Sequence, residues 1–482
     1  MDEDGRRRLT LYATVLGSSL AFIDATAVIV ALPAIGEDLG LDLGGRQWIF
    51  LSYSLALASF YLAAGAIGDR LGRREVFVAG AVAFALTSVL AGLAPDGATL
   101  IVARVLQGVA GAFLTTNSLA LLREVYGRDA GRAVGLWTAL TGVATIAGPP
   151  AGGAIVEWVS WRWIFIVNLP LAALTVVLAL CGRCRLREQH TVGRLDVPGA
   201  LLAAVGFGAL TYGLVQGGEE GFGSAWWALL VAAAALGAFF AVELRSREPM
   251  LPLRLFRRRN FAASNLETFF AYAALGGMLL YFALFLQFLG FSPFEAGLIN
   301  IPTSLVMIGL STRVGTLADR FGPRLFLAVG PALIGAGMLF YLPLSEKSDF
   351  WLFGIPGLGL FSVGLALTVA PITSTALSSV PGDLAGVASG VNQTVARLGG
   401  LLAVAVIGLV VTLVFESSGG AAGAIPLARG QLDPDLRAAS LEAFRAGTVV
   451  AAALAFVGAL VGLGISNEEA RAAPRAAPAT GR

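Results

Sequence analysis

The chain has 482 residues, of which 57% are hydrophobic and only 13% are charged, and its formal net charge is +2. Soluble domains carry about a quarter charged residues, so this chain has too few polar side chains to cover a water-facing surface of its size. The composition therefore excludes a soluble enzyme, a nucleic-acid-binding protein and a disordered chain.

Fourteen long apolar stretches follow one another along the chain. A hydrocarbon core about 30 Å thick requires roughly 20 apolar residues in a helix, and lipid forces backbone groups to pair within each helix. The first stretch is too long for the apolar region of a signal peptide, and the runs lack the alternation of a membrane barrel. The predicted helical spans are 9–33, 47–68, 75–94, 98–122, 131–156, 163–182, 198–216, 225–243, 262–289, 296–316, 325–344, 350–378, 384–415 and 443–465.

The basic residues orient these spans. With the N-terminus in the cytoplasm, 25 of the 33 basic residues fall in cytoplasmic segments, six in outer segments and two inside spans. Because cytoplasmic loops carry the excess of basic residues, the sequence predicts a multi-pass protein of a cytoplasmic membrane, with both termini in the cytoplasm.

One segment is repeated. Gly65–Arg74 recurs as Gly315–Arg324 at an offset of 250, and each copy follows the second span of a six-span block. The repeat predicts two homologous six-helix lobes, 1–182 and 261–465, joined by a linker, 183–260, that adds two spans; a cytoplasmic tail, 466–482, follows. Such parallel repeats are typical of transporters that bind substrate between the lobes.

Five segments are similar to motifs of a known family: 24–33, 65–74, 104–112, 148–153 and 161–170. Through them the chain resembles the major facilitator superfamily, and within it the fourteen-span drug/proton antiporters of bacteria. Two positions depart from the family pattern, Ile29 where asparagine is usual and Ala144 where glycine is usual. The resemblance implies an all-α fold of two six-helix lobes plus two central helices, and export of amphipathic small molecules by alternating access.

Four ionisable residues lie inside predicted spans, where a charge costs at least about 2.5–3.5 kcal/mol. Asp24 is a candidate proton carrier, because a carboxyl there can gain or lose a proton according to how water reaches it; the alternative is a permanently protonated structural residue. Glu267 is a second candidate proton site, or a contact for a cationic drug, or a side chain that extends to the interface.

Arg104 keeps its proton, so it cannot carry one. It can bond backbone carbonyls near Gly148–Pro149, or act on a nearby carboxyl through its charge, and the resemblance implies a part in proton coupling. Arg397 fits a bracing role in the thirteenth span.

The repeated loop and its neighbour predict a cytoplasmic gate, in which carboxylates pair with arginines or with helix N-termini. The predicted gate residues are Gly65, Asp69, Arg70, Gly72, Arg73, Arg74, Arg128, Asp319, Arg320 and Arg324.

Small residues in the fifth span predict close helix packing and a bend, and the resemblance implies that this element seals the lobe interface. This antiporter motif comprises Gly135, Gly148, Pro149, Gly152 and Gly153. An apolar cavity with a few polar groups suits amphipathic drugs. The candidate cavity residues are Tyr53, Asn117, Phe270, Tyr272, Tyr281, Gln287, Asn300, Asn392 and Gln393.

The sequence has no phosphate-binding loop, and its two cysteines and one histidine predict no metal site. We therefore expect no cofactor, no ATP and no nucleic acid, but a monomer in the bilayer that is driven by a proton gradient. Two alternatives remain: a proton-coupled symporter for a nutrient on the same fold, and a membrane sensor without transport.

Overall fold

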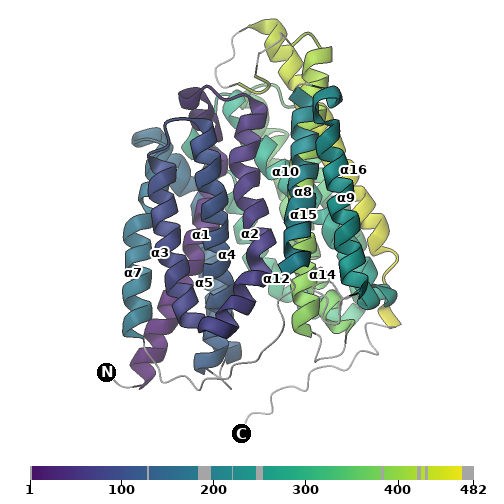
Figure 1. The fold of residues 1–482 in the computed structure, drawn as a ribbon. Coiled ribbons are helices and arrows are strands. Elements are labelled where there is room, and N and C mark those ends of the chain that lie inside the picture. The colour runs from purple at the N-terminus through teal and green to yellow at the C-terminus, as the bar shows by residue number, and fades with distance from the viewer. Residues whose placement is uncertain are drawn as a thin grey trace. The chain divides into compact units, whose positions relative to one another are not determined.

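The computed structural model describes residues 3–126, 130–182, 197–219, 221–245, 253–380, 385–420, 425–428 and 433–468. Over this part of the chain it is helical, without strands. Figure 1 shows that most of the helices are long. Ten of the described helical segments are long and apolar enough to cross a membrane, and two shorter apolar helices cover 201–217 and 323–339.

The described helices match the fourteen predicted spans when α6 is counted with α7 and α11 with α12. Their bounds are α1 Glu3–Leu39, α2 Leu43–Leu71, α3 Arg73–Gly92, α4 Gly97–Tyr126, α5 Ala130–Trp158, α6 Trp163–Ile166, α7 Asn168–Cys181, α8 Val197–Glu219, α9 Phe222–Arg245, η2 Leu253–Arg257, α10 Arg259–Phe288, α11 Pro293–Leu298, α12 Ile301–Phe321, α13 Pro323–Leu339, η3 Lys347–Trp351, α14 Gly354–Ser378, α15 Ala385–Ser417 and α16 Pro434–Gly462.

Polar side chains start several of these helices. Asp42 accepts a hydrogen bond from the Gly45 N–H at 2.7 Å at the beginning of α2, and Asp96 accepts from the Thr99 N–H at 2.8 Å before α4. These bonds satisfy amide groups that the helix itself leaves unpaired. Asp96 lies outside the spans, and its bond to the Thr99 amide lowers the pKa of its carboxyl.

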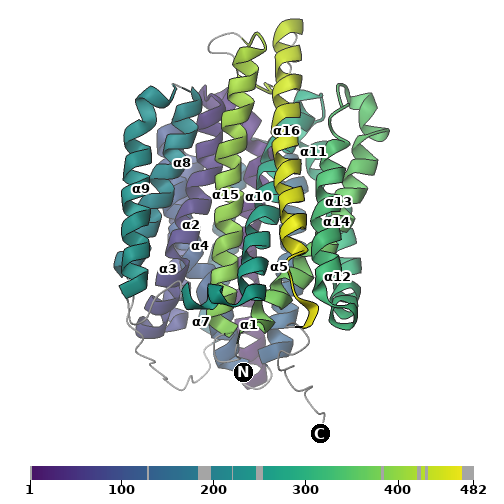
Figure 2. The ribbon, with the colours of Figure 1, turned by 90° about the vertical axis from the view of Figure 1, so that its right-hand side faces the viewer.

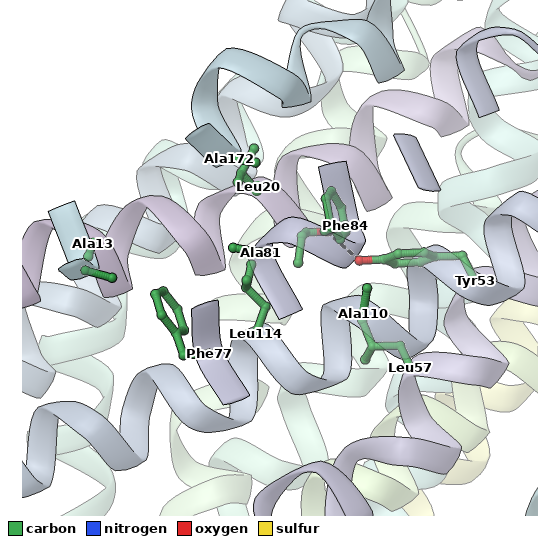
Figure 3. Close-up of a cluster of buried hydrophobic side chains, with 12 residues drawn as sticks. Ala13, Leu20, Tyr53, Leu57, Phe77, Ala81, Phe84, Ala110, Leu114 and Ala172 are labelled. Carbon is green, nitrogen blue, oxygen red and sulfur yellow. Dashed lines mark hydrogen bonds between the residues drawn. The ribbon is translucent and has the colours of Figure 1, made fainter. Parts of the chain in front are cut away.

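The chain divides into two compact units. Unit 1 comprises residues 1–250, 282–301 and 415–440, which are α1 to α9, the last turns of α10, α11, the end of α15 and the start of α16. Its core lies where α1, α2, α3, α4 and α7 meet, and Figure 3 shows Leu20, Phe77, Phe84 and Leu114 converging there. The inserted helices α8 and α9 pack on each other, and α8 packs on α2.

Unit 2 comprises residues 251–281, 302–414 and 441–482. It holds most of α10, α12, α13, α14, most of α15 and most of α16. Figure 2 shows α13 and α14 side by side. Gly337 and Gly357 allow this close packing, because a Cβ on either glycine would meet the backbone of the other helix within 2.7 Å.

The sequence repeat is also a structural repeat. Gly72 ends α2 and precedes α3 with φ +98°, and Gly322 stands between α12 and α13 with φ +94°. In both copies the glycine N–H donates to a helix carbonyl four residues back, that of Gly68 or Ala318. A positive φ disfavours residues with a side chain. The same sharp turn therefore explains why both copies of the repeat have glycine at this position.

Candidate functional site

A buried ion pair joins α1 to α4 inside unit 1. Arg104 donates through Nη1 to Oδ2 of Asp24, and both side chains are completely buried. Arg104 thus lies in direct contact with a carboxyl, and its effect on that carboxyl stays a prediction. The carbonyl that it bonds is that of Ile49, at 3.3 Å from Nε, and not one near Gly148–Pro149.

Two amides complete the coordination of the carboxylate. Gln107 and Asn168 donate to Oδ1 of Asp24 at 3.0 and 3.1 Å. Both amides also donate to the hydroxyl of Ser88, at 2.9 and 3.3 Å. Both oxygens of Asp24 therefore have partners, drawn from α4 and α7. Ser88 of α3 joins through the two amides, and the cluster of five polar side chains has no exposed member.

Aromatic rings cover the guanidinium group. The Tyr53 ring centroid lies 4.2 Å from Cζ of Arg104, and the Phe165 centroid lies 5.7 Å away. The Tyr53 hydroxyl donates to the Ala21 carbonyl at 3.0 Å, which holds the ring in place. Cation–π contacts of this kind stabilise a desolvated cation by up to about 2 kcal/mol.

Local helix geometry explains how the site forms. Asp24 lies one turn after Leu20 and Ala21, so it faces the same core as these residues. Arg104 and Gln107 are three residues apart and therefore share a face of α4, where Arg104 Nη1 also donates to Gln107 Oε1 at 2.8 Å. Figure 3 shows the apolar side of this arrangement, with Tyr53 directed toward α1.

The pair can act as a charge switch. A proton on Asp24 removes the negative charge and leaves Arg104 as a buried cation without its counter-ion. Removing one partner of a buried pair typically costs about 3–5 kcal/mol. Among the described atoms, Nη2 of Arg104 has no hydrogen-bond partner, so the guanidinium has a donor available for another group.

The antiporter motif lies in α5 between α1 and α11, all within unit 1. A Cβ on Gly148 would lie 2.0 Å from Thr26 Oγ1, and one on Gly152 would lie 2.7 Å from the Ala27 side chain. On the other side of α5, a Cβ on Gly153 would lie 2.3 Å from the Pro293 carbonyl oxygen. The predicted close packing is thus present on both faces of the helix.

A glycine of α11 also allows the close contact between α11 and α5. A Cβ on Gly297 would lie 2.4 Å from the Pro149 carbonyl oxygen. Glu157 accepts from the Phe294 N–H at 3.3 Å, and the rings of Trp158 and Phe294 lie 5.3 Å apart. Gly135 also lies in α5, but its surroundings are not among the described parts of the structure.

Two gate arginines bind carbonyl groups of neighbouring helices. Arg73 donates through Nη1 to the carbonyl of Ala120, inside α4, at 3.2 Å. Arg74 donates to the carbonyls of Ala179 and Leu180 in the last turn of α7, at 2.9 and 3.1 Å. A cation at a helix C-terminus offsets its partial negative charge, which applies to Arg74, and the two arginines together tie α3 to α4 and α7.

The remaining gate residues lie at the α2–α3 and α12–α13 turns. Arg324 donates its N–H to Asn467 Oδ1 at 3.2 Å, and Arg320 lies over the Phe321 ring at 5.3 Å. A Cβ on Gly65 would touch Thr116 at 3.1 Å. Arg70 is exposed. The side chains of Asp69 and Asp319, and the whole of Arg128, lie outside the described part of the chain.

Several predicted cavity residues have protein partners within unit 1. Tyr53 covers Arg104, as described. Asn117 donates to the carbonyls of Ala64 and Phe113 at 3.1 and 2.8 Å. Gln287 donates to the Val30 carbonyl at 2.9 Å. These partners hold the three side chains against neighbouring helices.

Other candidates lie at the end of α11 and in unit 2. Asn300 donates to Ala296 at 3.3 Å, Tyr281 to Val404 at 2.8 Å, and Asn392 to Thr268 Oγ1 at 2.8 Å. Phe270 and Tyr272 are half-buried, and Gln393 is exposed. Contact of any of these residues with a substrate stays a prediction.

Sequence reasoning assigns no role to the three residues that complete the Asp24 site. Gln107 and Asn168 belong to motifs of the fourth and sixth spans, and each is a polar residue in an apolar run. Ser88 carries no comparable signal, since a hydroxyl in a span can bond its own helix.

Long apolar helices define this protein as a multi-pass membrane protein, and the internal repeat shows that it is built from two similar halves. The family model of the Major Facilitator Superfamily matches residues 14–404, and the chain belongs to this superfamily.

Its relatives include resistance proteins of Mycobacterium and Streptomyces. The multidrug resistance protein Stp of Mycobacterium tuberculosis is 37% identical over 83% of this chain and 75% of its own. The tetracenomycin C resistance and export protein of Streptomyces glaucescens is 35% identical over 84% and 76%, and the puromycin resistance protein pur8 of Streptomyces alboniger is 34% identical over 85% and 82%.

Solved structures show the same fold. A bacterial homolog of the human lysosomal transporter Spinster, in an inward-facing and unoccupied conformation, aligns over 97% of both chains with a TM-score of 0.67 and 17% identity.

Proposed function

We propose that the protein is a proton-coupled antiporter that exports amphipathic small molecules across the bacterial cytoplasmic membrane. The observation that carries the proposal is the buried Asp24–Arg104 pair, which is a protonatable carboxyl and a fixed cation in direct contact. The names of the relatives, which include export and resistance to tetracenomycin C and puromycin, support amphipathic antibiotics as the substrate class.

Proton binding supplies the coupling. A proton that reaches Asp24 from outside ends its charge pairing with Arg104, and the unpaired cation favours a rearrangement of α1 against α4. One proton crossing the membrane provides about 2.3 kcal/mol per 100 mV and about 1.36 kcal/mol per pH unit. This energy is of the same order as the cost of breaking a buried pair, so the proton gradient can drive the switch.

The close packing of α5 on α1 and α11 suits antiport. Helices in backbone contact exclude water and ions from the space between them, and an exchanger has to prevent protons from leaking without substrate. We place both termini in the cytoplasm on the distribution of the basic residues, and we assign no cofactor to the transport cycle.

The test uses everted vesicles with an acidified lumen and puromycin as the first substrate. Substrate addition should make the lumen less acidic in wild-type vesicles, because protons leave as substrate enters. Asp24→Asn should abolish this exchange. Asp38→Asn is the matched control, because Asp38 is a half-exposed acid of the same helix that pairs with Arg162 at 2.6 Å.

Two results would contradict the proposal. If Asp24→Asn still accumulates a neutral substrate against its gradient at the wild-type rate, Asp24 is not the proton carrier. If whole cells that express the protein take up the substrate in a proton-driven way, the protein is a symporter.

A further inference from the structure

Unit 2 contains a buried acid of a different kind from Asp24. Glu267 in α10 is completely buried, and neither of its carboxyl oxygens has a hydrogen-bond partner among the described residues. The Glu267 side chain therefore does not extend to the membrane–water interface. An isolated buried carboxylate is very costly, whereas a carboxyl that carries a proton is neutral and far less so.

The neighbours on α10 show which way Glu267 points. Ala263, one turn before it, packs against Leu327 of α13 and Ile372 of α14. Phe270 and Ala271, three and four residues after it, lie at Gly458 of α16, where a Cβ would be 3.4 Å from the Phe270 Cβ and 3.7 Å from the Ala271 backbone nitrogen. Residues four apart share a helix face, so Glu267 faces the junction of α10 with α13, α14 and α16.

Asn265 and Thr268 show that α15 covers a different face of α10. Both bond Asn392 of α15, at 3.4 and 2.8 Å. Glu267 lies two residues after Asn265, which turns it about 200° around the helix. Its side chain is therefore enclosed within unit 2 on the side away from this contact.

No described charged group faces Glu267 from the elements packed around it. α14 contains no ionisable residue at all. On α13 the only one is Arg324, in the first turn, and the last on α16 is Arg445, thirteen residues before Gly458. Arg259 starts α10 and bonds the Gly464 carbonyl at 2.9 Å.

Two further charged residues lie on neighbouring segments. Glu468 is exposed beyond the end of α16. Arg397 belongs to α15 and acts electrostatically on Tyr272. Among the described residues, Glu267 is thus without a counter-charge, unlike Asp24.

The repeat shows that the fold does not require an acid at this place. At the offset of 250, Glu267 corresponds to Gly17 and Leu327 to Phe77. In unit 1, a Cβ on Gly17 would lie 2.8 Å from the Phe77 ring, so carbon fills the equivalent junction. In unit 2 a smaller leucine replaces the ring, and a carboxyl side chain replaces the hydrogen of glycine.

A polar stripe connects Glu267 with the start of α10, the end that the arginines assign to the cytoplasm. Asn260, Ser264 and Glu267 are spaced by four and three residues and so share one face. Asn260 exchanges two hydrogen bonds with the backbone of Ser466, at 2.9 and 2.8 Å. The hydroxyl of Ser264 is buried one turn before Glu267, and neither this hydroxyl nor the Glu267 carboxyl has a partner in the described structure. The hydroxyl therefore passes a proton to the carboxyl only after one of the two side chains rotates toward the other.

We propose that Glu267 is a second proton-binding site, which exchanges its proton with the cytoplasm by way of Ser264. The step is simple protonation: a carboxylate oxygen binds a proton and becomes a neutral carboxylic acid. This inference rests on the proposed function, because the second proton belongs to the same transport cycle. It adds that the two units bind protons differently, one with a counter-ion and one without.

The test measures protonation directly in the purified protein in lipid nanodiscs. The infrared carbonyl band of a protonated carboxylic acid should be present in the wild type at neutral pH, weaken as the pH is raised, and be missing in Glu267→Gln. Glu75→Gln is the control, because Glu75 is exposed at the start of α3, and it should keep the band. Ser264→Ala should keep the band but slow its hydrogen–deuterium exchange severalfold.

A second measurement follows proton release on substrate binding, with a pH indicator dye. Glu267→Gln should release one proton fewer per bound substrate than the wild type does. The inference is overturned if the acid band persists in Glu267→Gln, if the band of the wild type does not change until the protein unfolds, or if the proton count is equal. If substrate releases no proton from the wild type, the proposed coupling fails, whereas the infrared result still decides whether Glu267 binds a proton.

Discussion

Asp24 and Arg104 depend on each other for burial. Each is a charged side chain without exposure to solvent. Their contact, together with the hydrogen bonds of Gln107, Asn168 and Ser88, offsets the free-energy cost of that burial. A site of this kind is sensitive to the loss of one charge and tolerant of the loss of both, since only the first change leaves an unpaired ion.

This reciprocity predicts the outcome of a double-mutant cycle. Arg104→Gln should lower the free energy of unfolding by about 3–5 kcal/mol, and Asp24→Asn combined with Arg104→Gln should lower it by less than the sum of the single changes. Chemical denaturation of the purified protein measures both. Arg162→Gln is a control with an expected cost of about 0–1 kcal/mol, because its pair with Asp38 is half-exposed. Strict additivity would show that the two charges are not coupled.

At the scale of the helix, glycines decide how closely α5 approaches its neighbours. The same helix contains glycines in contact with other backbones and one in open space. Gly152 lies against Ala27, whereas a Cβ on Gly142 would meet nothing within 4 Å. The two positions therefore separate the effect of packing from that of helix propensity.

Alanine substitutions at these two glycines of α5 should change the stability of the protein in opposite directions. Gly152→Ala should destabilise the protein by about 1–3 kcal/mol, because α1 has to move away. Gly142→Ala should stabilise it by up to about 1 kcal/mol, because alanine favours the helix. Thermal unfolding of the two variants compares them. Equal shifts in the unfolding temperature would mean that the α1–α5 contact does not govern stability.

The turns of the repeat allow a similar comparison in unit 2. Gly322→Ala should cost about 1–3 kcal/mol, because a side chain is strained at φ +94°. Gly315→Ala, in α12 just before this turn, should cost little, since its Cβ would have open space. Denaturation midpoints measure the difference, and an equally stable pair would show that the turn relaxes without strain.

At the scale of the whole molecule, the basic residues predict how the chain is oriented in the membrane. The excess of arginine lies on one side of the predicted spans, and we expect that side to face the cytoplasm, because cytoplasmic loops carry the excess of basic residues. The arrangement is repeated in the two halves, since Arg70 and Arg320 occupy equivalent positions of the repeat, one residue before the ends of α2 and α12.

Thiol labelling can test this orientation. In a background with Cys181→Ser and Cys184→Ser, Trp351→Cys should react with a membrane-impermeant reagent in intact cells. Leu71→Cys should react only after the cells are permeabilised. Both residues are exposed, at 75% and 70%, so accessibility alone does not separate them. The reverse pattern would invert the predicted topology.

Asp24 and Glu267 show the limits of sequence reasoning most clearly. Sequence identifies both as ionisable residues in apolar spans, because the rarity of charge in such runs is itself the signal. It does not show that Asp24 has Arg104 as its counter-ion while Glu267 has none. Nor does it show that Tyr53 and Asn392 point at neighbouring helices, since the rotation of a helix is set by packing.

The sequence by itself determined that this chain is a membrane protein and how its spans are spaced, because the thickness of a bilayer, the pairing of backbone groups in lipid and the charge of the loops act on each segment separately. The superfamily was indicated by the resemblance of five short motifs, which are also local in the sequence. Only the tertiary structure decided that Ser88, Arg104, Gln107 and Asn168 meet at Asp24, since these residues are up to 144 positions apart. Their meeting depends on how helices pack, and packing is a property of facing surfaces rather than of any one segment.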